Sequence, residues 1–109
     1  MSIKFSDLHL DKNILSALTS AGYETPTPIQ AQAVPLALEG RDLMASAQTG
    51  SGKTAAFLLP TLQRLTRRSD KPGKGARALV LTPTRELAAQ VEKNALTYAK
   101  NMKWFRTVS

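Results

Sequence analysis

The most constraining feature of the sequence is a glycine-containing loop between a short apolar stretch and an amphipathic one. Residues 47–54 read AQTGSGKT and match the phosphate-loop pattern G-x-x-x-x-G-K-[ST] at Gly52, Lys53 and Thr54. Ala47 departs from the pattern only mildly, because alanine tolerates most backbone conformations except positive φ. Backbone N–H groups of such a loop wrap a phosphate, and the following helix directs its positive end at the anion. The order strand, loop, helix favours nucleotide binding over a chance Gly-rich turn.

The polar residues at the end of this loop have distinct expected roles. Lys53 is expected to reach the β- and γ-phosphates of a nucleotide as a point charge, and the Thr54 hydroxyl is placed to ligand Mg²⁺. These two residues are therefore the catalytic candidates, and Thr54 is the candidate metal ligand.

Helical spacing predicts two helices before the loop. The first is expected within residues 11–22, with Asp11 as its N-cap and Gly22 as the residue that stops it. Thr27 is the expected cap of the second helix, with Pro28 at its first position, where the missing N–H costs nothing. This helix should run to Gly40, with Pro35 bending it or loosening one turn.

Three short apolar segments are expected to be strands, at residues 42–47, 78–82 and 105–108, with helices at 53–68 and 85–101 between them. The helix at 53–68 should bury an apolar stripe made of Phe57, Leu58, Leu62 and Leu65. Two helices followed by β-α-β-α-(β) imply an α/β fold with a parallel sheet.

Composition narrows the class of protein. The 109 residues include 15 Lys+Arg and 8 Asp+Glu, for a net charge of +7, with one His and no Cys. Disulfide frameworks, thiolate chemistry and multi-histidine zinc sites are thereby excluded. No apolar run approaches the roughly 18 residues of a membrane span, and the start lacks a signal-peptide pattern. We therefore expect a soluble, cytoplasmic protein without membrane contacts.

The positive charge is concentrated in one half of the chain. Residues 1–60 carry four bases and five acids, whereas residues 61–109 carry eleven bases and three acids. This asymmetry indicates a polyanionic partner, with nucleic acid first. For the basic run from Arg67 to Arg77, however, a solvated surface loop is the favoured interpretation.

A second stretch could recognise a base. Residues 22–30 (GYETPTPIQ) read as a turn, a cap and a helix start. The Gln30 amide nevertheless carries a donor and an acceptor side by side, which is the geometry that pairs with N6 and N7 of adenine. Phe5 and Tyr23 are available to stack on such a base. The residues alone leave both interpretations open.

Three stretches resemble motifs of the DEAD-box RNA helicases, in the order and at the spacing of that family. Residues 22–30, with Phe5 seventeen residues before Gly22, resemble its Q motif. Residues 47–54 resemble motif I, which has Ala where the general pattern has Gly. Residues 83–90 (PTRELAAQ) resemble motif Ia. The resemblance covers essentially the whole chain and is closest to the bacterial RhlE-type branch.

The resemblance implies a RecA-like fold with ATP or ADP and Mg²⁺ as cofactors and RNA, single-stranded or duplex, as partner. Residues 1–40 would form an N-terminal helical region with the Q motif, and residues 41–109 an incomplete RecA-like ATP-binding domain. Gln30 would read adenine and Phe5 would stack near it. The implied nucleotide contacts are Phe5, Tyr23, Gln30, Thr49, Gly50, Ser51, Gly52, Lys53 and Thr54. The implied RNA-backbone contacts are Pro83, Thr84 and Arg85, although Arg85 and Glu86 alone would read as a helix-start charge pair.

Several parts that the family uses do not occur in this sequence. They are the Asp-Glu-Ala-Asp segment, the Ser-Ala-Thr motif and the second RecA-like domain with its arginine finger. An arginine finger alone is worth about 10³–10⁵ in rate. We therefore expect these 109 residues neither to turn over ATP nor to unwind a duplex.

The same absence affects the expected sheet. In RecA-like sheets the strand before the phosphate loop lies between strands that come later in sequence, and these do not occur here. The strand at 42–47 should then have unpaired edges. We expect a marginal fold, a domain-swapped oligomer or a part of a longer chain.

Two other functions are compatible with parts of the sequence. One is a nucleotide-binding module without hydrolysis or unwinding. The other is a phosphate-loop ATPase or GTPase unrelated to RNA, which Gln30, the PTREL stretch and the lack of a guanine-reading N-K-x-D stretch all disfavour.

Overall fold

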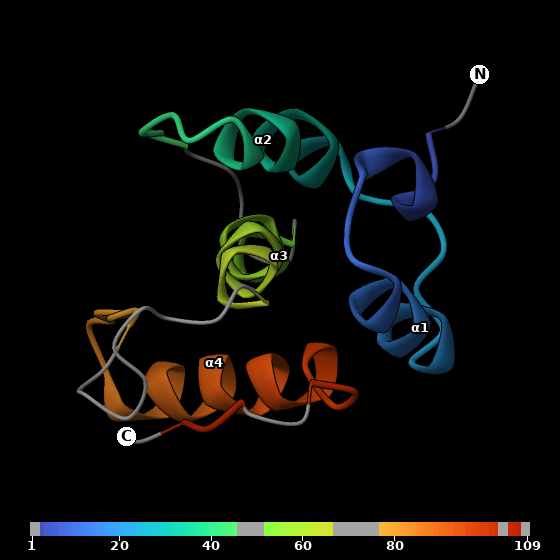
Figure 1. The fold of residues 1–109 in the computed structure, drawn as a ribbon. Helices are drawn as coiled ribbons and strands as arrows, with labels where there is room; N and C mark the ends of the chain where they lie inside the picture. Colours follow the sequence, from blue (N-terminus) through green and yellow to red (C-terminus); the bar gives the residue numbers. More distant parts are fainter. Residues whose placement is uncertain (1–2, 46–51, 67–76, 103–104, 108–109) are drawn as a thin grey trace.

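The computed structural model describes residues 3–45, 52–66, 77–102 and 105–107. Within these ranges lie a short 3-10 helix, η1 (Phe5–Leu8), and the helices α1 (Lys12–Ser20), α2 (Pro28–Leu38), α3 (Lys53–Leu65) and α4 (Arg85–Tyr98). Helix α3 lies in the middle of the molecule, with α2 on one side and α4 on the other (Figure 1). Helix α1 packs against α3 and α4, and η1 packs against α2.

The predicted helix boundaries are largely confirmed. Asp11 caps α1 by accepting a hydrogen bond from the Asn13 amide at 2.8 Å. Gly22 has φ +88° and donates its N–H to the Thr19 carbonyl at 3.0 Å, as expected of a glycine that ends a helix. Helix α4 begins at Arg85, as predicted, and ends three residues before Asn101.

Helix α2 also follows its sequence signals. Thr27 is its N-cap residue and Pro28 its first residue, and the helix continues through Pro35 to Leu38. Gly40, with φ +90°, follows the helix end.

The core is formed by apolar side chains from all five elements. Its members include Phe5, Leu8, Leu10, Ile14, Leu18, Val34, Leu58, Leu59, Leu62, Val91, Ala95, Tyr98 and Met102. Leu58 and Leu62 are buried as predicted, and Leu65 packs partly buried against the core. The prediction for Phe57 is wrong, since its side chain is 41% exposed. The buried face of α3 is centred on Leu58, Leu59 and Leu62, and Phe57 lies outside it, about 140° from Leu62 around the helix.

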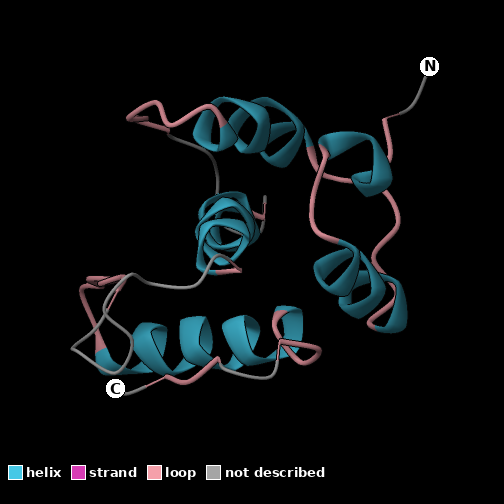
Figure 2. Cartoon of the chain, in the orientation of Figure 1, coloured by secondary structure: helices cyan, strands magenta, loops and turns pink. Residues whose placement is uncertain are grey.

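The predicted parallel sheet is not confirmed. Where the structure describes the expected strand segments 42–47, 78–82 and 105–108, none of these residues is a strand (Figure 2). Residues 42–45 and 78–81 are exposed, with Leu79 at 81% and Leu81 at 85%. A strand needs a neighbour to accept and donate its backbone hydrogen bonds, and no such neighbour lies within the described ranges.

Among the described helices, none is long and apolar enough to cross a bilayer.

Candidate functional site

The phosphate-loop candidate ends in an uncapped helix. Gly52 is the N-cap residue of α3, and its φ of +90° lies in the left-handed region that favours glycine. Among the described residues, no side chain caps this helix. Because the first amides of a helix have no acceptor within it, the start of α3 offers N–H groups to an anion.

Lys53 and Thr54 are the first two residues of α3. The Lys53 side chain is exposed and makes no hydrogen bond or ion pair with another described residue, so its ammonium is available to a phosphate. The Thr54 side chain is half-buried. The other expected loop contacts, Thr49, Gly50 and Ser51, lie outside the described residues.

Gln30 joins the start of α2 to the end of the loop. Its side chain is 7% exposed. Its Oε1 accepts a hydrogen bond from the Thr27 backbone N–H at 2.9 Å, and its Nε2 donates to the Gly52 carbonyl oxygen at 3.1 Å. The structure therefore brings the candidate base reader together with the candidate phosphate loop.

Gly52 is required here for a second reason besides its φ. A Cβ atom at this position would overlap Nε2 of Gln30 and would lie 2.9 Å from Oγ1 of Thr27. The Gln30 amide cannot simply move aside, because both of its polar atoms are hydrogen-bonded. The contact between α2 and the loop is thus closed to any residue larger than glycine.

Gln30 keeps capacity for a further ligand. A side-chain amide has two N–H donors and two lone pairs on oxygen, and Gln30 uses one of each within the protein. One donor and one lone pair therefore remain, which is the number that adenine pairing needs.

Thr27, which was expected only to cap α2, also lies beside the end of the loop at Gly52. Its hydroxyl oxygen is buried and has no hydrogen-bond partner in the described part of the chain. Thr27 and Gln30 have the T-x-x-Q spacing of a capping box, in which the two side chains satisfy the first amides of a helix. The T-x-x-Q spacing is therefore a sequence signal that predicts the proximity of the Thr27 and Gln30 side chains.

The two aromatic candidates lie together elsewhere. Phe5 and Tyr23 both line a cavity of about 170 Å³, and Gln30 is not among its lining residues. Phe5 is almost fully buried, whereas Tyr23 is 48% exposed. The Phe5 amide donates to the Glu24 carbonyl at 3.1 Å, which fixes η1 beside the turn that carries Tyr23.

Tyr23 also contacts the last helix. Its ring packs edge-on against that of Tyr98, with ring centroids 6.1 Å apart. Burial raises the pKa of Tyr98, and the neighbouring Tyr23 hydroxyl raises it further. The Q-motif candidate is therefore packed against α4 as well as against the loop.

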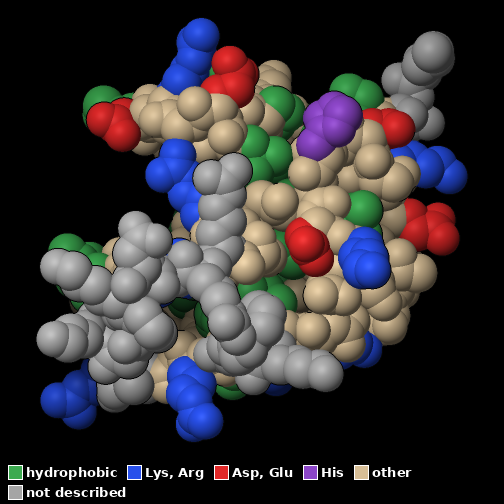
Figure 3. Space-filling view, in the orientation of Figure 1, with side chains coloured by type: hydrophobic (Ala, Val, Ile, Leu, Met, Phe, Trp, Pro, Cys, Tyr) green, Lys and Arg blue, Asp and Glu red, His purple; other side chains and the backbone are tan. Residues whose placement is uncertain are grey.

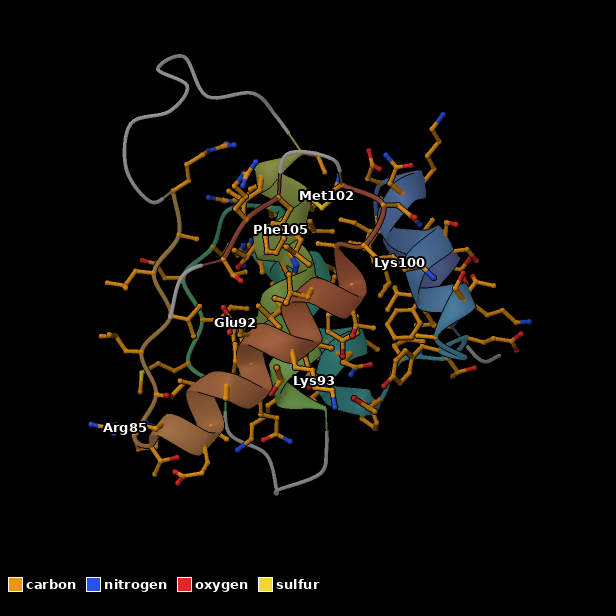
Figure 4. All side chains as sticks on the ribbon, turned by 90° about the horizontal axis from the view of Figure 1, so that it is seen from below. Arg85, Glu92, Lys93, Lys100, Met102 and Phe105 are labelled. Carbon is orange, nitrogen blue, oxygen red and sulfur yellow. The ribbon has the colours of Figure 1, made fainter. Side chains whose placement is uncertain are left out.

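The candidate RNA contacts lie at the start of α4. Pro83, Thr84 and Arg85 are all exposed. The Thr84 hydroxyl accepts a hydrogen bond from the Leu87 amide at 3.1 Å and so caps α4. The Arg85 side chain points away from the helix body (Figure 4). An exposed helix start whose arginine makes no ion pair with another described residue suits phosphate oxygens.

These features place the helix start that follows the candidate phosphate loop against Gln30 of the candidate Q motif. The family model of DEAD/DEAH box helicases matches residues 27–108. The chain belongs to the DEAD/DEAH box helicase family.

Individual relatives agree with this assignment. The chain is 54% identical over 97 residues to the ATP-dependent RNA helicase SrmB of Escherichia coli, covering 89% of this chain and 22% of that protein. It is 50% identical over 105 residues to the ATP-dependent RNA helicase DeaD of the same species, covering 96% of this chain and 16% of that protein. The particular resemblance to the RhlE-type branch stays a prediction.

A solved structure shows the same fold. The RNA helicase Prp28 of Chaetomium thermophilum, bound to ADP, matches with a TM-score of 0.87 and 42% identity. The match covers 98% of this chain and 26% of that one. The chain thus spans from about a tenth to a quarter of the length of the proteins it matches.

Proposed function

We propose that the chain is the N-terminal part of an ATP-dependent DEAD-box RNA helicase. It binds ATP or ADP with Mg²⁺ through the Q motif and phosphate loop, and it contacts single-stranded RNA backbone through residues 83–85. The hydrogen bond from Gln30 Nε2 to the Gly52 carbonyl carries the proposal, because it joins a potential adenine reader to a potential phosphate binder. The ADP bound to Prp28, a relative of the same fold, supports it.

The residues present fit a magnesium nucleotide. The start of α3, which no described side chain caps, and the Lys53 ammonium would hold phosphate, and the Thr54 hydroxyl would hold the metal. The described residues contain no cluster of three or more metal-ligating His, Cys, Asp or Glu. Mg²⁺ usually keeps several waters and binds one or two carboxylates together with substrate phosphates, so the Thr54 hydroxyl would be one ligand beside phosphate oxygens and water. When bound, the ion neutralises phosphate charge.

The full-length enzyme would hydrolyse ATP and unwind RNA, whereas the 109 residues alone do neither. The reason is chemical, because the sequence contains no Asp-Glu-Ala-Asp segment to supply the metal-holding acid. This same observation favours the second candidate, a nucleotide-binding module without turnover. We keep the division into residues 1–40 and 41–109 as part of the proposal.

The test is a titration of fluorescent mant-ATP with Mg²⁺ into the 109-residue chain. Lys53→Ala should remove most of the affinity, because no other described base takes its place at the start of α3. Lys12→Ala is the matched control, since Lys12 is an exposed first residue of another helix. Unchanged binding by Lys53→Ala would reject the phosphate-loop assignment.

A time course of phosphate release, with and without RNA, tests the lack of turnover. We expect no release above background in either case. RNA-stimulated release would show that the chain hydrolyses ATP and would overturn that part of the proposal.

A further inference from the structure

The outward face of α4 carries cations that nothing in the described part of the chain neutralises. Lys93 in α4 and Lys100, two residues after its end, are exposed on the side away from the buried Val91 and Ala95. Neither lysine makes a hydrogen bond or an ion pair with another described residue. Both point to the same side of α4, and Arg85 extends from its first turn (Figure 4).

Of the two acids of α4, Glu92 extends away from Lys93, whereas Glu86 lies on the face of Lys93. Glu92 is half-buried and accepts a hydrogen bond from the Thr107 hydroxyl at 2.7 Å. In Figure 4 it extends on the side opposite to Lys93. Glu86 lies in the first turn, seven residues and about 10 Å before Lys93, so this face carries an acid near Arg85 and none between Lys93 and Lys100.

The spacing of the cations follows from helix geometry. Lys100 lies two residues after the end of α4 at Tyr98; helix geometry continued over the seven residues from Lys93 gives about two turns, which puts the two lysines on one side about 10 Å apart. Arg85 lies about 12 Å before Lys93 along the axis. The backbone remains helical close to Lys100, because the Ala99 amide donates to the Ala95 carbonyl at 2.9 Å. Cations are therefore placed at the start of α4, in its middle and just after its end, with Glu86 beside the first of them.

In the space-filling view, exposed bases also mark the lower edge of the molecule, on the side where α4 lies (Figure 3). A phosphate chain is the ligand that suits isolated lysines at regular spacing, since lysine binds phosphate as a point charge without base readout. A distance of about 10 Å corresponds to about three stacked nucleotides at 3.4 Å each.

We propose that Lys93 and Lys100 form a second contact surface for the RNA phosphate backbone, continuous with residues 83–85. This inference rests on the proposed RNA binding and extends it from one end of α4 to the other. RNA longer than the reach of residues 83–85 gains affinity from the two lysines.

The experiment compares two fluorescently labelled oligo-uridines, about 4 and about 12 nucleotides long, at several salt concentrations. For the longer RNA, the double variant Lys93→Gln/Lys100→Gln should bind more weakly. The slope of log affinity against log salt should fall by about 1.4, at about 0.7 per lost contact with a single strand. The shorter RNA extends about 10 Å at 3.4 Å per nucleotide and cannot reach from Arg85 to Lys100, so its affinity should change much less.

Controls separate this surface from total charge and from folding. Lys4→Gln/Arg41→Gln removes two exposed bases away from α4 and should leave both affinities nearly unchanged. Lys93→Arg/Lys100→Arg keeps the charges and should retain the salt slope. Glutamine and lysine have similar helix propensity, so the far-ultraviolet circular dichroism of the Gln variant should match that of the parent.

The outcomes distinguish the inference from the proposed function. If Arg85→Gln weakens both RNAs while the double lysine variant binds the longer RNA normally, RNA binding stands and the second surface is rejected. Equal losses on short and long RNA by the lysine variant also reject it. If the parent chain binds an acidic polypeptide such as poly-glutamate as tightly as RNA, with the same loss in the variant, the assignment to RNA is overturned. If the parent binds neither RNA, both proposals fail.

Discussion

The side-chain amide of Gln30 donates a hydrogen bond of 3.1 Å to the carbonyl oxygen of Gly52, which lies 22 residues further along the chain. This bond holds the first turn of α2 against the first turn of α3. Each residue limits what the other can be, because Gly52 has no room for a Cβ and Gln30 has both polar atoms engaged. Changes at either residue should therefore affect stability and nucleotide binding together.

Gly52→Ala should destabilise the chain more than its backbone conformation alone explains. The positive φ costs about 1–2 kcal/mol for a residue with a Cβ. Overlap with the hydrogen-bonded Gln30 amide should add about 1–3 kcal/mol, the usual cost of overpacking. Urea unfolding monitored by circular dichroism measures the sum of these two losses in the free energy of unfolding.

Gly22→Ala is the matched control for this prediction. Gly22 has nearly the same φ, +88°, but nothing lies within 4 Å of its added Cβ. Its variant should lose the conformational part only. Equal losses in the two variants would show that the contact with Gln30 contributes nothing.

Gln30→Ala should lower the affinity for mant-ATP more than that for mant-GTP. The loss common to both nucleotides reports the missing bond to Gly52, and the additional loss for ATP reports adenine pairing. Gln30→Glu is informative because it keeps the acceptor for the Thr27 amide and removes the donor to Gly52. An equal loss for ATP and GTP in the Ala variant would reject adenine reading and leave only the structural role.

Thr84→Ala should cost about 0.5–2 kcal/mol of stability, the usual effect of removing an N-cap side chain. The reason is the bond that the Thr84 hydroxyl accepts from the Leu87 amide. Thr84→Ser keeps that oxygen and should restore most of the stability in urea unfolding. If Thr84→Ala and Thr84→Ser unfold alike, the hydroxyl does not cap α4 in solution, and its assignment to RNA becomes the simpler one.

Local signals in the sequence predicted the helices well and the tertiary contacts poorly. Asp11 and Gly22 mark the two ends of α1 as expected, because cap and stop residues act on neighbouring backbone groups. The hydrogen bond between Gln30 and Gly52 joins residues far apart in sequence. The capping-box spacing predicts only the local contact of Gln30 with Thr27. No local sequence pattern predicts the hydrogen bond between Gln30 and Gly52.

The expected strands show the same limit from another direction. Leu79, Val80 and Leu81 have the continuous apolar character of a buried strand, yet their exposed fractions are 81%, 41% and 85%. Composition predicts that such a segment favours strand structure, but a strand forms only where a neighbour completes its hydrogen bonds. Whether the neighbour is present depends on the rest of the sheet and not on the segment.

These exposed segments predict that the 109-residue chain associates with itself. Met44, Leu79 and Leu81 are each more than 80% exposed, and apolar residues without pairing partners favour contact with another chain. Sedimentation velocity should show a mass that increases with protein concentration. Leu79→Lys/Leu81→Lys should lower the mass towards that of one chain, because a charged edge opposes pairing. Leu96→Lys changes an exposed leucine on α4 and should leave association intact. A parent chain that sediments as one species of 11.8 kDa at every concentration would rule out self-association.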